Sequence, residues 1–203
     1  MNRVKTYFIN CDFLSDSAEF EKHCKTASPY RRKKIDSLRF DSDKRLCLGA
    51  DILLHRAFGC LADSERDGEN GDRPQIDGVN YSVSHSGSIA MLTVGDCEVG
   101  CDIQLIDKTH SLRTAEKFFT DNENTQIKES ENPIRTFFRL WAIKESYIKM
   151  LGTGLATPLD SFEVNLGGGA DIDGCSVKEY FFFDGYVAAV CTKGSADFSV
   201  IKE

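Results

Sequence analysis

Residues 137–155 read FFRLWAIKESYIKMLGTGL, and this stretch predicts an amphipathic helix that ends at two glycines. Phe137, Trp141 and Glu145 recur every four residues, so one helix face carries a carboxylate among apolar side chains. Lys149 follows Glu145 by one turn, and a solvated pair is the ordinary interpretation of that spacing. A carboxylate on an apolar face needs a cation, so Glu145 is also a candidate functional group.

The composition limits the class of protein. The chain has 203 residues, 41% of them hydrophobic, and a net charge of −7 at pH 7. This length allows one domain or two small ones with a substantial core. An acidic chain is poorly suited to general nucleic-acid binding, which needs a basic face. With no long apolar run and no secretory signal in the sequence, we expect a cytoplasmic protein that binds neither nucleic acid nor membrane.

The eight cysteines are scattered along the chain and form no C-x-x-C pair. A zinc site is therefore not expected. Several of them lie in apolar segments, where a free cysteine behaves as a small buried hydrophobic residue. We expect free thiols and no disulfide scaffold.

A basic run opens another predicted helix. Ser28 and Pro29 are a helix start signal, and the cations of YRRKK follow at residues 30–34. Cations at a helix N-terminus oppose the helix dipole, so a bound anion would stabilise them. Arg31 and Arg32, with Arg45 downstream, are candidate phosphate contacts. A solvated basic face is the plainer alternative.

The segment YSVSHSGSIAMLTVG, which begins at residue 81, predicts two strands joined near Gly87. Ser82, Ser84 and Ser86 share one face of the first strand, which makes that face hydroxylated. Hydroxyls and the His85 imidazole at a strand end suit phosphate oxygens. Ordinary turn chemistry remains the alternative.

Residues 97–106, CEVGCDIQLI, form a strand by their alternation. Asp102 and Gln104 share one face of it, roughly 7 Å apart. An aspartate in an apolar strand departs from strand propensity, and such departures often mark function. Asp102 and Glu145 together could bind Mg²⁺ and leave coordination positions for water and phosphate. An aspartate that simply reaches solvent at a strand end is the alternative for Asp102.

The order of these segments resembles the 4′-phosphopantetheinyl transferases of the Sfp type. The resemblance covers most of the chain and rests on VSHS (83–86), VGCDIQ (99–104), WAIKESYIK (141–149) and GLATPLDSF (154–162), with further support from SPYRRKK (28–34) and RLCLGADILL (45–54). It implies an α/β (α+β) fold of two similar α/β halves, residues 1–99 and 100–203. The halves would be related by pseudo-two-fold symmetry, with the active site in the cleft between them.

The implied activity is the transfer of 4′-phosphopantetheine from coenzyme A to a serine of an apo carrier protein. The acyl, peptidyl or aryl carrier would be the partner of a monomeric enzyme, 3′,5′-ADP would be released, and Mg²⁺ would be required. By motif position Asp102, Glu145 and Gln104 would face the metal, and Glu145 would also act as the base. Glu123 falls where many members carry another acidic residue near the metal.

The resemblance also implies contacts with the phosphates. Lys149 and His85, which are catalytic candidates together with Glu145, would touch them, and Arg31 or a neighbour would hold the 3′-phosphate. The candidate contacts to coenzyme A are Arg31, Arg32, Arg45, Arg73, Ser84, His85, Lys144 and Lys149.

The chain departs from the family pattern at Gln104, where members usually carry a second carboxylate. An amide oxygen can still bind a metal, but it contributes no charge. Two alternatives share the same residues. One is a metal-dependent phosphohydrolase of coenzyme A or a nucleotide, and the other is a coenzyme A-binding module whose catalytic site has decayed.

Overall fold

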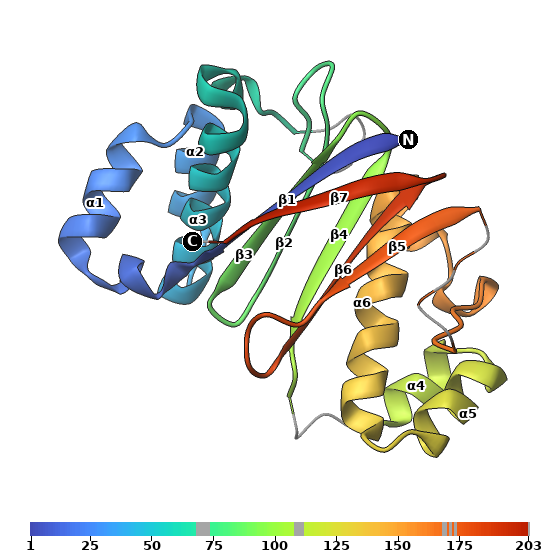
Figure 1. The fold of residues 1–203 in the computed structure, drawn as a ribbon. Helices are drawn as coiled ribbons and strands as arrows, with labels where there is room; N and C mark the ends of the chain where they lie inside the picture. Colours follow the sequence, from blue (N-terminus) through green and yellow to red (C-terminus); the bar gives the residue numbers. More distant parts are fainter. Residues whose placement is uncertain (68–73, 108–111, 168–169, 171, 173, 203) are drawn as a thin grey trace.

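Two β-sheets lie at the centre of the fold, with helices α1–α3 on one side and α4–α6 on the other (Figure 1). The computed structural model describes residues 1–67, 74–107, 112–167, 170, 172 and 174–202. Along the chain the strands and α-helices are β1 (Asn2–Asn10), α1 (Ser17–Thr26), α2 (Pro29–Ser37), α3 (Asp41–Phe58), β2 (Asn80–Ser86), β3 (Ile89–Gly95), β4 (Val99–Leu105), α4 (Arg113–Phe118), α5 (Asp121–Glu129), α6 (Pro133–Leu151), β5 (Cys175–Tyr180), β6 (Tyr186–Lys193) and β7 (Ala196–Lys202).

The first sheet has the order β2-β3-β1-β7, and the second has the order β4-β6-β5. All pairs are antiparallel except β1 and β7, which run parallel from the pair Asn2 and Ala196 to the pair Phe8 and Lys202. β7 therefore belongs to the same sheet as β1, although β7 lies after residue 99, where we expected the boundary between the two halves.

Three apolar clusters hold these layers together. Tyr7 and Ile9 of β1 pack against α3 in the first cluster. Phe137 and Leu140 of α6 pack against the second sheet in another. Phe8 of β1 lies in the third cluster, between the two sheets. Alternation along β1 therefore sends its successive side chains into two different cores.

Helix α6 confirms the helix predicted from residues 137–155 and begins four residues earlier. Asn132 caps its first turn, because its side-chain oxygen accepts a hydrogen bond from the Arg135 N–H at 3.1 Å. Gly152 ends the helix in a left-handed conformation, with φ of 69°. Gly154 lies beyond this cap, in the separate short 3₁₀ turn Gly154–Ala156.

Side-chain hydroxyls join the two sheets where β2 and β4 meet. Alternate serines of β2 accept hydrogen bonds from alternate backbone N–H groups of β4: Ser82 from Cys101 at 3.1 Å, Ser84 from Ile103 at 3.3 Å and Ser86 from Leu105 at 2.9 Å. We call these three bonds the serine ladder. The hydroxylated face that the sequence predicted is therefore real, but its serines bind the backbone of β4.

No helix among the described residues is long and apolar enough to cross a membrane. All eight cysteines are free, as expected. The cytoplasmic location stays a prediction.

Helix α6 lies directly on β4 at Gly100. A Cβ at this position would meet the carbonyl oxygen of Ser146 and the amide nitrogen of Met150, and would lie 2.9 Å from the carbonyl carbon of Lys149. Glycine is needed here because the helix backbone and the strand approach each other closely.

Gly100→Ala should destabilise the protein, because the helix backbone atoms that meet the new methyl group cannot rotate away. Overpacking of this kind costs about 1–3 kcal/mol, which denaturant unfolding would measure. Gly167→Ala is the matched control, since its Cβ would meet only the side-chain oxygen of Asn165, at 3.1 Å. Equal losses of stability in the two variants would contradict this account of packing.

Candidate functional site

Asp102 is the centre of the candidate site. It lies on β4, is only 3% exposed, and accepts hydrogen bonds on both carboxylate oxygens. Oδ1 accepts one from Lys149 Nζ of α6 at 2.6 Å and one from Ser84 Oγ of β2 at 2.8 Å. Oδ2 accepts one from Gln104 Nε2 at 2.7 Å. Elements of both sheets and α6 thus meet at this carboxylate.

Glu145 and Lys149 lie one turn apart on α6, and both are half-buried. Burial raises the pKa of Glu145, the charge of Asp102 raises it further, and Lys149 opposes the change. Burial alone would lower the pKa of Lys149, but Asp102 holds it above its ordinary value. The cation that Glu145 was expected to need is therefore shared with Asp102.

The available ligands are hard oxygen donors. Asp102 and Glu145 supply carboxylates, and Gln104 can supply its carbonyl oxygen because its amide nitrogen bonds Asp102. Within the described ranges, no group of three or more His, Cys, Asp or Glu side chains is placed to hold a metal. This set suits Mg²⁺, which usually takes one or two carboxylates and completes its shell with water and substrate phosphates.

Cations gather around His85 at the end of β2. The protein around the ring desolvates it and lowers its pKa, and Lys149, Lys34 and Arg31 lower that pKa further. The lowered pKa favours the neutral ring, which can donate one hydrogen bond to an anion. Lys34 was missed among the single candidates from the sequence, although it belongs to the basic run at residues 30–34.

A hollow of about 310 Å³ lies beside these cations, lined by Tyr30, Lys33, Lys34, Ser37 and Asp67. The Tyr30 hydroxyl donates a hydrogen bond to Asp67 Oδ1 at 3.1 Å. This bond joins α2 to the segment that follows α3, and both residues line the hollow.

Arg31 points into the protein and is only 4% exposed. Its guanidinium donates two hydrogen bonds to Glu65, from Nε at 2.5 Å and from an Nη atom at 2.6 Å. The Tyr81 hydroxyl also donates to Glu65, at 3.0 Å. Such a bidentate pair holds α2 in place, and it leaves Lys34 as the better placed of the two to meet a phosphate.

The other predicted arginines lie apart from this pair. Arg32 is exposed on α2. Arg45 of α3 lines a small hollow of about 60 Å³ with Gly87 and Ser88, at the turn that follows His85. Arg73 lies outside the described residues.

Lys144 is completely buried, unlike its neighbour Glu145. Its Nζ lies 2.6 Å from Glu123 Oε1 and donates to the carbonyl oxygens of Leu159 at 2.6 Å and Phe162 at 2.7 Å. These three partners use all the N–H donors of an ammonium group. Lys144, expected at coenzyme A, is thus bound to Glu123, expected near the metal, and we interpret the pair as structural.

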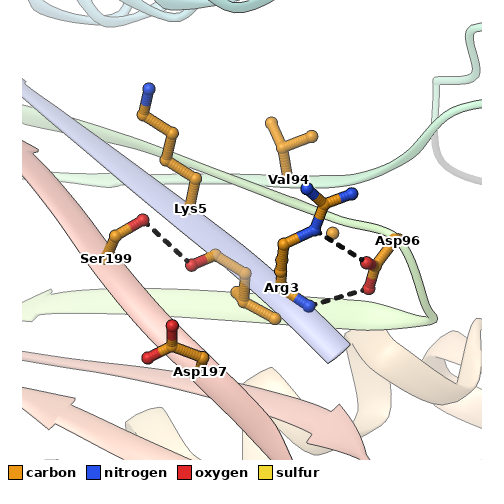
Figure 2. Close-up of a pocket in the computed structure, with 8 residues that line it drawn as sticks. Arg3, Lys5, Val94, Asp96, Asp197 and Ser199 are labelled. Atoms are coloured by element: carbon orange, nitrogen blue, oxygen red, sulfur yellow. Dashed lines mark hydrogen bonds and ion pairs between the residues drawn. The ribbon is translucent and has the colours of Figure 1, made fainter. Parts of the chain in front are cut away.

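A larger hollow, of about 470 Å³, lies elsewhere, along β1, β3 and β7 (Figure 2). Arg3 bonds Asp96 there through its backbone N–H at 2.9 Å and its Nε at 3.4 Å. None of the residues predicted for the site lines this hollow.

The chain is similar to known proteins over most of its length. Residues 98–191 match the 4′-phosphopantetheinyl transferase superfamily. The chain is 35% identical to the 4′-phosphopantetheinyl transferase ffp of Bacillus subtilis and 29% identical to Sfp of Bacillus subtilis strain 168, over 93% of this chain and 92% of each relative. It is also 29% identical to psf-1 of Bacillus pumilus, over 95% of this chain and 91% of that protein.

The chain belongs to the 4′-phosphopantetheinyl transferases, the enzymes that transfer phosphopantetheine to carrier proteins. Its relatives over nearly the whole length place it with the Sfp type.

Lys144→Met should lower the free energy of unfolding by roughly 3–5 kcal/mol, because it leaves Glu123 buried without its cation. Adding Glu123→Gln should recover part of the loss, since the amide carries no charge. Urea unfolding would compare the two variants. A stable Lys144→Met protein with a raised KM for coenzyme A would instead make Lys144 a ligand contact.

Proposed function

We propose that this enzyme takes 4′-phosphopantetheine from coenzyme A, transfers it to a serine of an apo carrier protein, and releases 3′,5′-ADP. The observation that carries this proposal is the meeting of Asp102, Lys149 and Ser84 beside the half-buried Glu145. This arrangement would offer the Lys149 cation to neutralise a pyrophosphate and the Glu145 carboxylate as a base for the attacking hydroxyl.

Positive charge would hold the pyrophosphate and the 3′-phosphate. Lys149 and the neutral ring of His85 would donate hydrogen bonds to phosphate oxygens, and Lys34 would extend this site toward α2. Arg32, Arg45 and Arg73 stay further candidates for the same role. Charge-assisted bonds of this kind are short and strong, so they fix the phosphates against the attacking serine.

Glu145 would accept the proton of the attacking serine. The bond that forms joins the serine oxygen to the β-phosphorus, and the bond that breaks joins this phosphorus to the bridging oxygen, which leaves with 3′,5′-ADP.

Asp102 and Glu145, with the carbonyl oxygen of Gln104, would hold Mg²⁺. When bound, this ion would neutralise charge on the pyrophosphate and orient its oxygens. The enzyme is proposed to act as a monomer.

The two halves, residues 1–99 and 100–203, are proposed to be related by pseudo-two-fold symmetry. The support is their common order of one strand, three α-helices and two strands, from β1 to β3 and from β4 to β6. In each half the third strand pairs with both others, as β2-β3-β1 and β5-β6-β4. The active site would lie in the cleft between the halves, with β7 added outside the repeat.

Incubation with coenzyme A, Mg²⁺ and an apo carrier protein should add one phosphopantetheine to the carrier serine, as read by intact mass spectrometry. EDTA should abolish the gain. Glu145→Gln should fold normally but lower turnover by at least roughly 10²-fold, because the base is lost. Release of phosphopantetheine without any carrier would point to a hydrolase, and coenzyme A binding without turnover would point to a decayed site.

Gln104→Glu should lower the Mg²⁺ concentration that half-saturates transfer, because a third carboxylate beside Asp102 and Glu145 strengthens an oxygen-ligand site. Asn165→Asp adds the same charge on an exposed turn and is the control. An unchanged Mg²⁺ requirement in Gln104→Glu would show that this position does not set metal affinity.

A further inference from the structure

Ser84 makes more hydrogen bonds than a rung of the serine ladder requires. Its Oγ accepts one from the Ile103 N–H at 3.3 Å, accepts a second from Lys149 Nζ at 3.1 Å, and donates one to Asp102 Oδ1 at 2.8 Å. Lys149 Nζ in turn donates to the same Asp102 oxygen at 2.6 Å. The three side chains therefore form a closed triangle of hydrogen bonds.

The Ser84 hydroxyl has no hydrogen-bonding position left for a further partner. A serine hydroxyl offers one donor and two acceptor lone pairs, and each of the three is occupied at Ser84. The side chain is also 6% exposed. A phosphate oxygen needs a donor, and Ser84 has none left, so the sequence-based assignment of Ser84 to coenzyme A would require breaking its bond to Asp102.

The triangle joins the two halves of the molecule. Ser84 lies on β2, whereas Asp102 lies on β4 and Lys149 on α6. A carboxylate and an ammonium group attract each other over many geometries, because Coulomb attraction is weakly directional. A third partner that is fixed to a buried strand selects one of these geometries.

We propose that Ser84 is a positioning residue, which fixes Asp102 and Lys149 before the metal and the phosphates arrive. This inference rests on the proposed function for the roles of those two residues. Ligating carboxylates are commonly oriented by hydrogen-bonded neighbours, whose loss typically costs about 10–100-fold in metal affinity or activity.

The serine ladder supplies a matched control. Ser82 is as deeply buried as Ser84 and accepts the N–H of Cys101 at 3.1 Å in the same way. Ser82→Ala and Ser84→Ala each remove one rung, so both should lower the thermal midpoint. Only Ser84→Ala also removes a contact to Asp102 and Lys149.

The test is a calorimetric titration of Mn²⁺, as a probe of the magnesium site, into the protein without coenzyme A. We expect Ser84→Ala to weaken Mn²⁺ binding by about 10-fold or more. Ser82→Ala should change it less than about twofold, because its rung bonds only the β4 backbone. Ser84→Thr keeps the hydroxyl and should restore most of the affinity, and Asp102→Asn should abolish binding.

Wild-type affinity in Ser84→Ala, with binding lost in Asp102→Asn, would overturn the inference and leave the metal site intact. Equal weakening in Ser82→Ala and Ser84→Ala would also overturn it, because the effect would then be general to the ladder. Absence of Mn²⁺ binding by the wild-type chain would overturn the proposed metal site and this inference with it. The expected Mn²⁺ pattern in a protein that fails to modify any carrier would support the inference and contradict the proposed function.

Discussion

The serine ladder between β2 and β4 is the interaction on which the rest of the structure depends. A strand edge has unpaired N–H groups, and burial of those groups without partners costs free energy. In this protein the edge of β4 meets β2, and hydroxyls supply the acceptors that a neighbouring backbone would otherwise provide. Serine side chains thus bridge the two sheets where β2 and β4 meet. Because Ser84 is one of these side chains, the same contact that joins the halves also reaches the candidate site.

The ion pairs inside the protein are of two kinds, which differ in how far the cation is exposed to solvent. Arg31 with Glu65 and Lys144 with Glu123 are buried pairs, in which the cation bonds its carboxylate inside the protein. Breaking such a pair is costly, and so they act as fixed supports. Lys149 with Asp102 is different, because Lys149 stays 30% exposed on its side chain and can also meet a ligand. Partial exposure, more than charge, separates the candidate functional cation from the structural ones.

Local anomalies in the sequence pointed to several residues that the structure brings together, and to the helix that carries two of them. Asp102 and Glu145 stood out because a carboxylate on an apolar strand or helix face breaks the expected pattern, and both lie with Lys149 in the structure. The partners of Arg31 and Lys144 could not be predicted, because Glu65 and Glu123 lie in polar segments where no local feature distinguishes one carboxylate from another. The serine alternation was visible, but its partner strand was not, since the pairing of side chains with a distant backbone is a property of tertiary structure.

The parallel pairing of β1 with β7 has a consequence for biosynthesis. During translation β1 is made before α6 and β6, whereas β7, the strand that completes its sheet, is made after them. The edge of β1 that pairs with β7 therefore stays unpaired until the segments between these two strands have been made, and contacts between such distant segments form slowly. An unpaired edge of this kind can join with another nascent chain. The late pairing of β7 with β1 thus covers a strand edge through which partly folded chains could otherwise associate.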